Sequence, residues 1–297
     1  MGRREKFVSV MVGFGYGRIQ LEGNLGNIGS YMESGTFAIV TGAGSGIGRA
    51  TAIELSKESL TILAVGRRRS ALEETAEKAP GEIRCLSADV SSDVGCRAII
   101  DAIGINSRVK FLVHAAGISP INRVQDTGIE CWRRVMRTNL DAQFILTTSL
   151  IQNLAGGGRV LFVGSNSAKK PRKGAAAYCV SKAASYMLQE CLKLELDDEH
   201  ILVTSAIPSP VNTDMVRSHI STDSNIFPDG NEYAQLLAEG KLIEPSIVGE
   251  FFQWLLTRTR EERYVTEDWN IQDQSHHPEW LRGKALWPGL LAPGLPL

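Results

Sequence analysis

The chain has 297 residues, a formal net charge of −1 and 43% hydrophobic residues. This length suits one large α/β domain and is sufficient to bury a sizeable core. The near-zero charge provides no overall basic field, so neither nucleic acid nor an anionic membrane surface is expected as a partner. No run of about 18 apolar residues occurs, which excludes an ordinary membrane-spanning helix.

The cysteines and histidines give no indication of a metal site. Two adjacent histidines, His276 and His277, have no placed Cys, Asp or Glu partners, so we interpret them as a polar surface pair and expect no metal. Cysteine spacing likewise shows no CxxC motif, and the odd number favours a reducing, cytoplasmic compartment. The five cysteines are Cys85, Cys96, Cys131, Cys179 and Cys191.

The ends of the chain differ from its middle. Residues 1–31 are Gly-rich and are predicted to form a flexible extension, since glycines interrupt what would otherwise resemble a signal peptide. Residues 32–275 hold the regular pattern and are predicted to form the single catalytic domain. Residues 276–297 contain scattered Trp and Pro without a period, which predicts an irregular C-terminal tail.

Short apolar runs alternate with amphipathic stretches, a pattern typical of repeated βαβ units. It predicts a Rossmann-type, doubly wound parallel sheet with helices on both faces. The longest helices are expected at Glu130–Leu150 and Ala176–Leu196, and a last strand near Arg263–Val265. Other strands are expected at Phe37–Thr41, Leu60–Val65, Ile83–Ala88, Phe111–His114, Arg159–Val163 and Leu202–Ala206.

A glycine-rich turn follows the first expected strand directly and opens a helix. Glycines allow the backbone to approach a pyrophosphate closely, and the helix N-terminus offers free N–H groups to the phosphates. A tight turn without a ligand is the alternative, but the strand–turn–helix context favours a dinucleotide site. The predicted contacts are Gly42, Ser45, Gly46, Ile47 and Gly48.

Three arginines, Arg67, Arg68 and Arg69, follow the second expected strand, where an acidic residue would bind the ribose of NAD. A guanidinium at this position is suited to the 2′-phosphate of NADP, and Arg67 is the best placed. The sequence therefore predicts NADP rather than NAD. The alternative is that the arginines only solvate the start of a helix.

Tyr178 and Lys182 lie four residues apart in a strongly helical stretch, so both side chains project from one face. A phenol has a pKa of about 10, which a neighbouring ammonium lowers toward the working pH. This pair is therefore a candidate general acid/base. By chance alone, the same spacing would more often be a packed tyrosine beside a surface lysine.

Together, the turn Gly42-x-x-x-Gly46-x-Gly48 and Tyr178-x-x-x-Lys182 make the sequence resemble the short-chain dehydrogenase/reductase family, from about Thr36 to about Val265. The resemblance implies that Asn139 and Ser165 complete a catalytic set with Tyr178 and Lys182. It also implies a substrate lid at Asp214–Lys241. Further cofactor contacts that it implies are Asp89, Val90, Ala116, Gly117, Pro208, Val211 and Thr213, besides Tyr178 and Lys182.

The chain departs from the family pattern at three points. His114 and Ala115 stand where the family has two asparagines, and Ser209 replaces a glycine next to the nicotinamide. The segment from Tyr264 to Asn270 replaces the usual closing motif. These departures affect contacts around the site rather than the four expected catalytic residues.

The resemblance implies an NADP(H)-dependent enzyme that interconverts a small carbonyl compound and its alcohol, working as a homo-oligomer. Ser165 and Tyr178 would donate hydrogen bonds to the substrate oxygen, Lys182 would bind the cofactor ribose, and Asn139 would hold a water molecule beside Lys182. Alternatives are an NAD-dependent alcohol dehydrogenase of the same family, a non-catalytic dinucleotide-binding scaffold or sensor, and a sugar-nucleotide epimerase. The substrate itself is not readable from the sequence.

A dense basic cluster, Lys169–Lys173, lies between Ser165 and Tyr178 and contains four positive charges. Such charges near a substrate entrance would attract anionic substrates. The simpler interpretation, that the loop is just solvated, is favoured.

Overall fold

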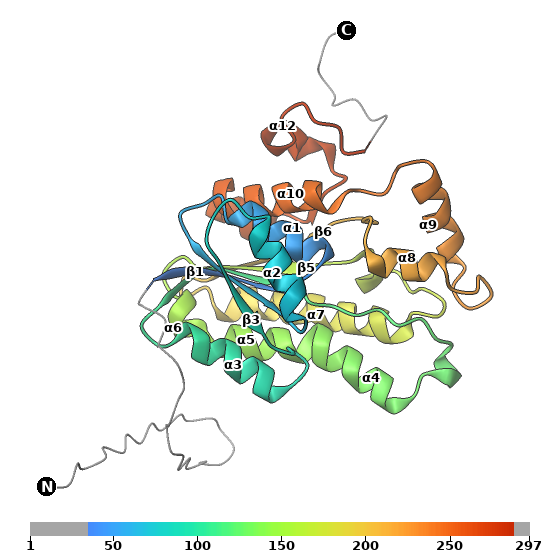
Figure 1. The fold of residues 1–297 in the computed structure, drawn as a ribbon, viewed down its shortest axis with the longest axis horizontal. Helices are drawn as coiled ribbons and strands as arrows, with labels where there is room; N and C mark the ends of the chain where they lie inside the picture. Colours follow the sequence, from blue (N-terminus) through green and yellow to red (C-terminus); the bar gives the residue numbers. More distant parts are fainter. Residues whose placement is uncertain (1–34, 288–297) are drawn as a thin grey trace, which may run out of the picture. The chain divides into compact units, whose positions relative to one another are not determined.

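A computed structural model describes residues 35–287 of the chain. Seven parallel strands form one sheet in the order β3-β2-β1-β4-β5-β6-β7, with helices around it (Figure 1). This confirms the predicted doubly wound α/β fold. The strands are β1 (Thr36–Thr41), β2 (Thr61–Gly66), β3 (Ile83–Ser87), β4 (Arg108–His114), β5 (Arg159–Val163), β6 (Leu202–Ile207) and β7 (Trp269–Asn270).

The helices alternate with the strands along most of the chain. Three short 3₁₀ turns accompany them: η1 (Val124–Asp126), η3 (Asn166–Ala168) and η4 (Gln274–His276). The α-helices are α1 (Gly46–Leu55), α2 (Arg69–Glu77), α3 (Asp93–Ile103), α4 (Ile129–Met136), α5 (Ala142–Ser149), α6 (Ile151–Leu154), α7 (Ala176–Glu195), α8 (Asp214–Ile220), α9 (Asp229–Ala238), α10 (Pro245–Arg258), α11 (Glu261–Thr266) and α12 (His277–Trp280).

The alternation of side chains along β1 builds two separate cores. Ala38 and Val40 pack with α1 and α10 on one face, whereas Phe37 and Ile39 pack with α3, α5 and α7 on the other. Successive residues of a strand point to opposite faces, so a strand that is buried on both sides is apolar throughout. The sheet is therefore covered on both faces, and its strand ends are left as the place for a site.

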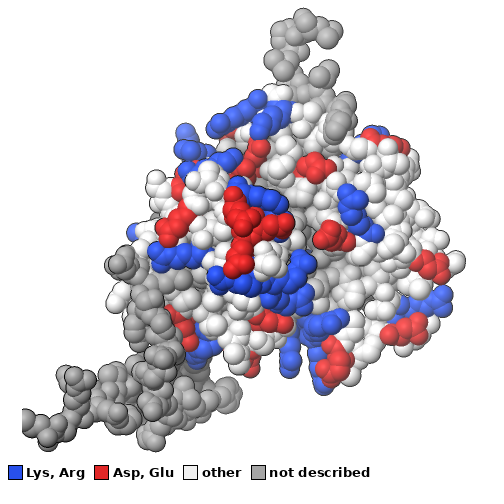
Figure 2. Space-filling view, viewed as in Figure 1, with Lys and Arg blue, Asp and Glu red and all other residues white. Residues whose placement is uncertain are grey.

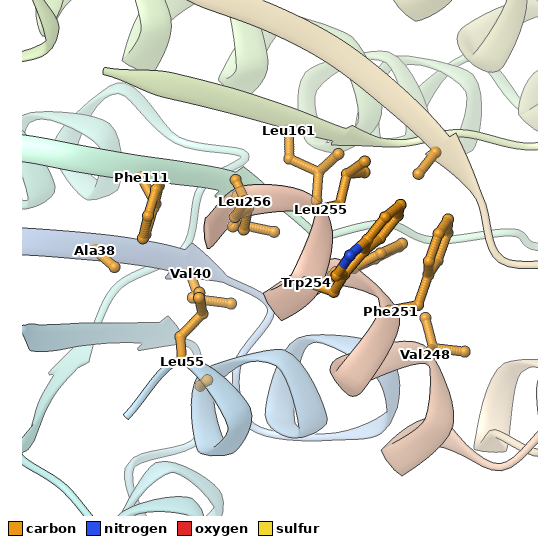
Figure 3. Close-up of a cluster of buried hydrophobic side chains, with 14 of the residues drawn as sticks. Ala38, Val40, Leu55, Phe111, Leu161, Val248, Phe251, Trp254, Leu255 and Leu256 are labelled. Carbon is orange, nitrogen blue, oxygen red and sulfur yellow. The ribbon is translucent and has the colours of Figure 1, made fainter. Parts of the chain in front are cut away.

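Helix α10 covers the first face with large side chains, including Phe251, Trp254 and Leu255 (Figure 3). Each of these side chains is almost fully buried, and such burial contributes about 1.5–3 kcal/mol per large apolar residue. A Cβ atom added at Gly249 would lie 2.8 Å from the backbone of Ala50, so α10 and α1 meet backbone to backbone. This contact holds the helix that follows the glycine turn in place.

The predicted strand at Arg263–Val265 is wrong, because these residues belong to α11. Glu261 and Glu262 in its first turn favour a helix N-terminus, and the buried Tyr264 hydroxyl donates to the carbonyl of Val160 at 3.0 Å. The seventh strand comes later, at Trp269–Asn270, and pairs with β6. Only three residues supported the predicted strand, too few for a reliable period.

The long helix predicted at Glu130–Leu150 is interrupted. A π-helical turn, η2 (Arg137–Asp141), separates α4 from α5 and contains Asn139. Single π turns inside α-helices occur frequently at functional sites. The second long helix matches its prediction within one residue, as α7 ends at Glu195.

His276 and His277 are each only 2% exposed, so their interpretation as a surface pair is wrong. The indole of Trp280 donates to Nδ1 of His276 at 2.9 Å, and His277 Nε2 lies 2.7 Å from the carbonyl oxygen of Ile271. The expected irregular tail thus begins with a packed segment that carries α12. The rest of that tail from residue 288, and the predicted extension at residues 1–31, lie outside the described residues.

No helix within residues 35–287 is long and apolar enough to cross a membrane. Acidic and basic side chains are interspersed on the face seen in Figure 2, in keeping with the near-zero net charge.

Candidate active site

The carboxyl ends of β1 and β4 lie side by side at the centre of the sheet, where the strand order reverses. Ligands of open α/β sheets bind at such switch points. Thr41 joins the two strand ends, because its hydroxyl accepts the N–H groups of Ala115 and Ala116 at 3.1 Å each and donates to the carbonyl of Val113 at 3.2 Å. The motifs picked out from the sequence meet at this edge.

The glycine turn has the close backbone contacts that a phosphate cradle needs. A Cβ at Gly42 would lie 2.9 Å from the backbone of Ala116, and one at Gly48 would lie 2.3 Å from the Gly42 carbonyl oxygen. Gly42 and Gly46 also have φ angles of +69° and +52°, which favour glycine. At the N-terminus of α1, Ser45 makes no capping hydrogen bond and the first turn has no acidic residue. These residues fit a dinucleotide pyrophosphate.

Arg67 and Asp89 lie at the adjacent ends of β2 and β3. Burial raises the pKa of the Asp89 carboxyl, but hydrogen bonds from Ser91 and the charge of Arg67 outweigh it, so the net pKa is lowered. The Arg67 side chain is exposed, and no hydrogen bond or ion pair joins its guanidinium to another described residue. Arg69, in contrast, is held by Glu73 at 2.7 Å. The guanidinium of Arg67 is therefore available to bind a ligand.

The other expected cofactor contacts line the same edge. The methyl carbon of Thr213 would lie 3.1 Å from a Cβ at Gly46, so the loop after β6 meets the glycine turn. Ser209 has a φ of +62°, a strained region for a non-glycine residue, which explains why the family pattern has glycine there. Of the remaining expected contacts, Val90, Pro208 and Val211 are buried, whereas Ala116 and Gly117 are half-buried.

Ser165 and Tyr178 lie close together beside this edge, near enough for the Ser165 side chain to influence the Tyr178 phenol. Ser165 follows β5, and its hydroxyl also accepts the N–H of Ser167 at 3.1 Å, which fixes its rotamer. Burial raises the pKa of Tyr178, and the neighbouring Ser165 hydroxyl lowers it in part. The net direction is opposite to the one expected from a neighbouring ammonium.

Lys182 lies one turn further along α7, with its Nζ 5.8 Å from the centre of the Tyr178 ring. Its ammonium donates to the carbonyl of Val163 at 2.7 Å. The side chain is 7% exposed, and burial lowers the pKa of Lys182 to about 8. The two predicted partners share one helix face, but the ammonium is bound to the end of β5.

The side-chain amide of Asn139 connects two segments beside the site by hydrogen bonds. Its Oδ1 accepts the N–H of Ile118 at 2.9 Å, and its Nδ2 donates to the carbonyl of Ile118 and to the hydroxyl of Ser181. Ser181 in turn donates to the carbonyl of Tyr178 at 2.8 Å. The loop after β4 is thus connected through Asn139 to the turn of α7 that carries Tyr178.

His114 occupies the position of the first family asparagine and is completely buried beneath the site. Its Nε2 lies 2.9 Å from the hydroxyl of Thr147, and its ring packs 4.9 Å from that of Phe162. Burial, helped by the charge of Lys182, lowers the pKa of His114 to about 3. The imidazole is therefore neutral under ordinary conditions.

Charge and spacing alone did not indicate a separate role for Arg172 within the basic cluster. Arg172 pairs with Asp229 on α9, and Lys169 lies 3.8 Å from Asp268. Only Lys170 and Lys173 are exposed without such a partner among the described residues, so fewer charges are free to attract an anion than the sequence suggests.

Within residues 35–287, no group of three or more His, Cys, Asp or Glu side chains is arranged to hold a metal ion.

Comparison with known proteins gives the family. Residues 36–224 match the model of the short chain dehydrogenases. The probable oxidoreductase EphD of Mycobacterium tuberculosis is 34% identical over 188 residues, which cover 61% of this chain but only 32% of that protein. The chain thus spans about a third of this relative. Versicolorin reductase from Emericella nidulans is 30% identical over 215 residues, covering 69% of this chain and 78% of that protein.

Among solved structures, L-sorbose reductase from Gluconobacter frateurii, in complex with NADPH and L-sorbose, is 25% identical with a TM-score of 0.68. The match covers 80% of this chain and 95% of that one. The family model, the sheet order and the site geometry agree. The chain belongs to the short-chain dehydrogenase family.

Proposed function

We propose that the protein is an NADP(H)-dependent oxidoreductase that interconverts a carbonyl and an alcohol by hydride transfer. The observation that carries this proposal is that Ser165 and Tyr178 lie close together at the sheet edge that also holds the glycine turn. A protein that only bound a dinucleotide would have no need of a proton donor there. The family consists of oxidoreductases, and versicolorin reductase is one of the relatives.

In the proposed mechanism, Ser165 and Tyr178 donate hydrogen bonds to the substrate oxygen. Bound nicotinamide would supply or accept the hydride. Negative charge grows on the substrate oxygen only in the transition state of reduction, so donors placed there lower the barrier. Tyr178 then delivers its proton. Its raised pKa keeps the phenol protonated and ready to donate in the direction of reduction.

Lys182 and Asn139 support this pair in the proposal. The Lys182 ammonium favours the phenolate that Tyr178 becomes, and is suited to the ribose hydroxyls of the cofactor. Asn139 holds the turn of α7 that carries Tyr178 next to the loop after β4, through its hydrogen bond to Ser181. The water-holding role that the family resemblance implies for Asn139 stays a prediction.

We propose NADP as the cofactor because Arg67 offers a guanidinium at the end of β2 and no acidic residue ends that strand. The similar L-sorbose reductase was solved with NADPH. A charge-assisted pair is worth about 1.5–3 kcal/mol, so Arg67→Ala should weaken NADPH binding by about tenfold to a hundredfold. NADH affinity should hardly change. Titration of both cofactors by fluorescence measures the two dissociation constants.

Arg69→Ala is the matched control for the cofactor prediction, since Arg69 belongs to the same run but pairs with Glu73. It should leave the ratio of NADPH to NADH affinity almost unchanged. Equal affinity of the wild-type protein for both cofactors would favour the NAD-dependent alternative.

The experiment that tests the proposed activity is a screen of NADPH oxidation against ketones, quinones and ketoacyl thioesters. Turnover of a carbonyl compound, with the alcohol identified as the product, supports the proposal. Tight cofactor binding without turnover of any compound would favour the scaffold or sensor instead.

We also propose that the protein is a homo-oligomer that associates through α5 and α7. Val180, Met187 and Leu194 are exposed at seven-residue intervals on α7, and Phe144 is exposed on α5. An apolar stripe of this kind is commonly covered by another chain. Met187→Glu should therefore dissociate the oligomer, as measured by size-exclusion chromatography with light scattering. Val94→Glu, at an isolated exposed residue of α3, should not.

A cytoplasmic location is proposed as well, and rests on cysteine chemistry. All five cysteines are free in the structure, and free thiols persist in reducing compartments.

A further inference from the structure

Arg172 differs from the lysines around it because its side chain is only 15% exposed. Its Nε donates to the hydroxyl of Ser167 at 3.1 Å, and its Nη1 forms an ion pair with the carboxylate of Asp229. The planar guanidinium serves both partners at once, which an ammonium cannot match. A half-buried ion pair whose guanidinium is also held by a second hydrogen bond contributes more than an exposed ion pair.

The two partners of Arg172 come from different segments of the chain. Ser167 belongs to η3, directly after Ser165, and its N–H donates to the Ser165 hydroxyl. Asp229 is the first residue of α9, in the segment Asp214–Lys241 that we call the lid. Arg172 therefore joins the loop that carries the proposed hydrogen-bond donor to the start of the second lid helix.

Tyr233 lies one helical turn after Asp229, on the same face of α9. The Arg172 guanidinium carbon is 6.0 Å from the centre of the Tyr233 ring, within the range of a cation–π contact. The ring also packs against Phe227 at 6.0 Å and stacks on His219 at 6.3 Å. Tyr233 contributes to the raised pKa of Tyr178, so its hydroxyl lies near this corner of the site.

The lid is attached at two other points. His219 Nε2 lies 3.0 Å from the carbonyl oxygen of Ser119, and a Cβ at Gly174 would lie 2.5 Å from the carbonyl oxygen of Ile226. Because neither contact is made by the Arg172 side chain, loss of the ion pair should loosen α9 without unfolding the lid.

We propose that Arg172 is a positioning residue whose ion pair with Asp229 closes α9 over the reaction centre and sets Tyr233 against the substrate as a specificity-determining side chain. This inference rests on the proposed function, since it takes Ser165 and Tyr178 as the reaction centre. It assigns no chemical step to Arg172 itself.

Hydrogen exchange tests the ion pair without requiring activity. In Arg172→Gln and in Asp229→Asn, the amides of α9 should exchange about tenfold faster than in the wild-type protein, while those of α7 keep their protection. Arg172→Lys should restore part of the protection, because the ammonium keeps the charge but not the fork. The control is Lys241→Gln, which removes an exposed cation at the end of the lid and should change nothing. Unchanged α9 exchange in Arg172→Gln, or the same increase in the control, would overturn the proposal.

Kinetics with a carbonyl substrate from the screen test the consequence for catalysis. Arg172→Gln should raise KM about tenfold and change kcat less than threefold, because closure of the lid favours binding rather than the proton transfer. Arg172→Lys should recover part of KM. A fall in kcat at constant KM would contradict a positioning role.

Tyr233→Ala tests the specificity part separately. It should change the ratio of kcat/KM for a bulky and a small ketone by about tenfold in favour of the bulky one. An unchanged ratio would remove Tyr233 from the proposal. If no carbonyl compound is turned over even by the wild-type protein, the proposed function fails, whereas the exchange experiment still decides whether Arg172 fastens α9.

Discussion

Tyr178→Phe is expected to reduce kcat by about 100-fold or more, equal to about 2.7 kcal/mol of transition-state stabilisation. The substitution removes the hydroxyl that lies beside Ser165 but keeps the ring on α7. Because the phenol is the only proton donor that we assign, no other side chain should replace it. Stopped-flow or steady-state NADPH oxidation measures the effect.

Binding of NADPH should stay nearly intact in Tyr178→Phe, which separates a catalytic defect from a folding defect. Tyr186→Phe is the matched control, since Tyr186 lies on the same helix with its ring beneath the Lys169 ammonium at 4.8 Å. It should keep wild-type turnover. Rates are best compared below pH 8, because burial lowers the pKa of Lys182 to about 8 and its charge supports the phenolate. Near-normal turnover of Tyr178→Phe would remove the central claim about the mechanism.

The second large effect concerns stability in acid and arises from His114. Its pKa is about 3 in the folded protein and about 6.5 in an unfolded chain, so the unfolded state binds the proton first. Stability is therefore fully present above about pH 6.5 and declines by about 1.4 kcal/mol per pH unit as the pH falls toward 3. A charged imidazole would also repel the neighbouring Lys182.

His114→Asn should reduce this acid slope by up to about 1.4 kcal/mol per pH unit between pH 6 and pH 4, as measured by urea unfolding at a series of pH values. The two proteins should show the same slope between pH 7 and pH 8.5, where His114 is neutral in both states. Burial also lowers the pKa values of His219 and His276, so some acid sensitivity should remain in the variant. An unchanged acid slope would mean that His114 does not control it.

Local chemistry was sufficient to predict most of the strands and the glycine turn. An apolar run between turn residues is a strand in almost any tertiary context, and β5 appears with the predicted bounds, Arg159–Val163. The turn requires glycine where a side chain would collide with nearby backbone atoms. The structure shows such close backbone contacts at Gly42 and Gly48. Tyr178 and Lys182 share a face because helical periodicity alone places them there.

Elements that depend on distant packing were predicted poorly. The π turn at Arg137–Asp141 is formed where Asn139 reaches Ile118 and Ser181, partners 21 and 42 residues away. The seventh strand of two residues exists because Trp269 is buried beneath α10. The sequence predicted a surface position for His276, but in the folded protein its ring stacks against Trp254 and Phe251.

By itself, the sequence determined the parallel α/β fold and predicted the dinucleotide cradle and the candidate acid/base pair, because each depends on residues close together in the chain. Only the tertiary structure decided the electrostatics of that pair. Burial raises the pKa of Tyr178, and the Lys182 ammonium donates to the carbonyl of Val163 at the end of β5. The tertiary structure also decided that Arg172, among the cations of the basic cluster, pairs with Asp229, 57 residues away. The sequence shows which residues are charged, but not which of them the fold buries beside a partner.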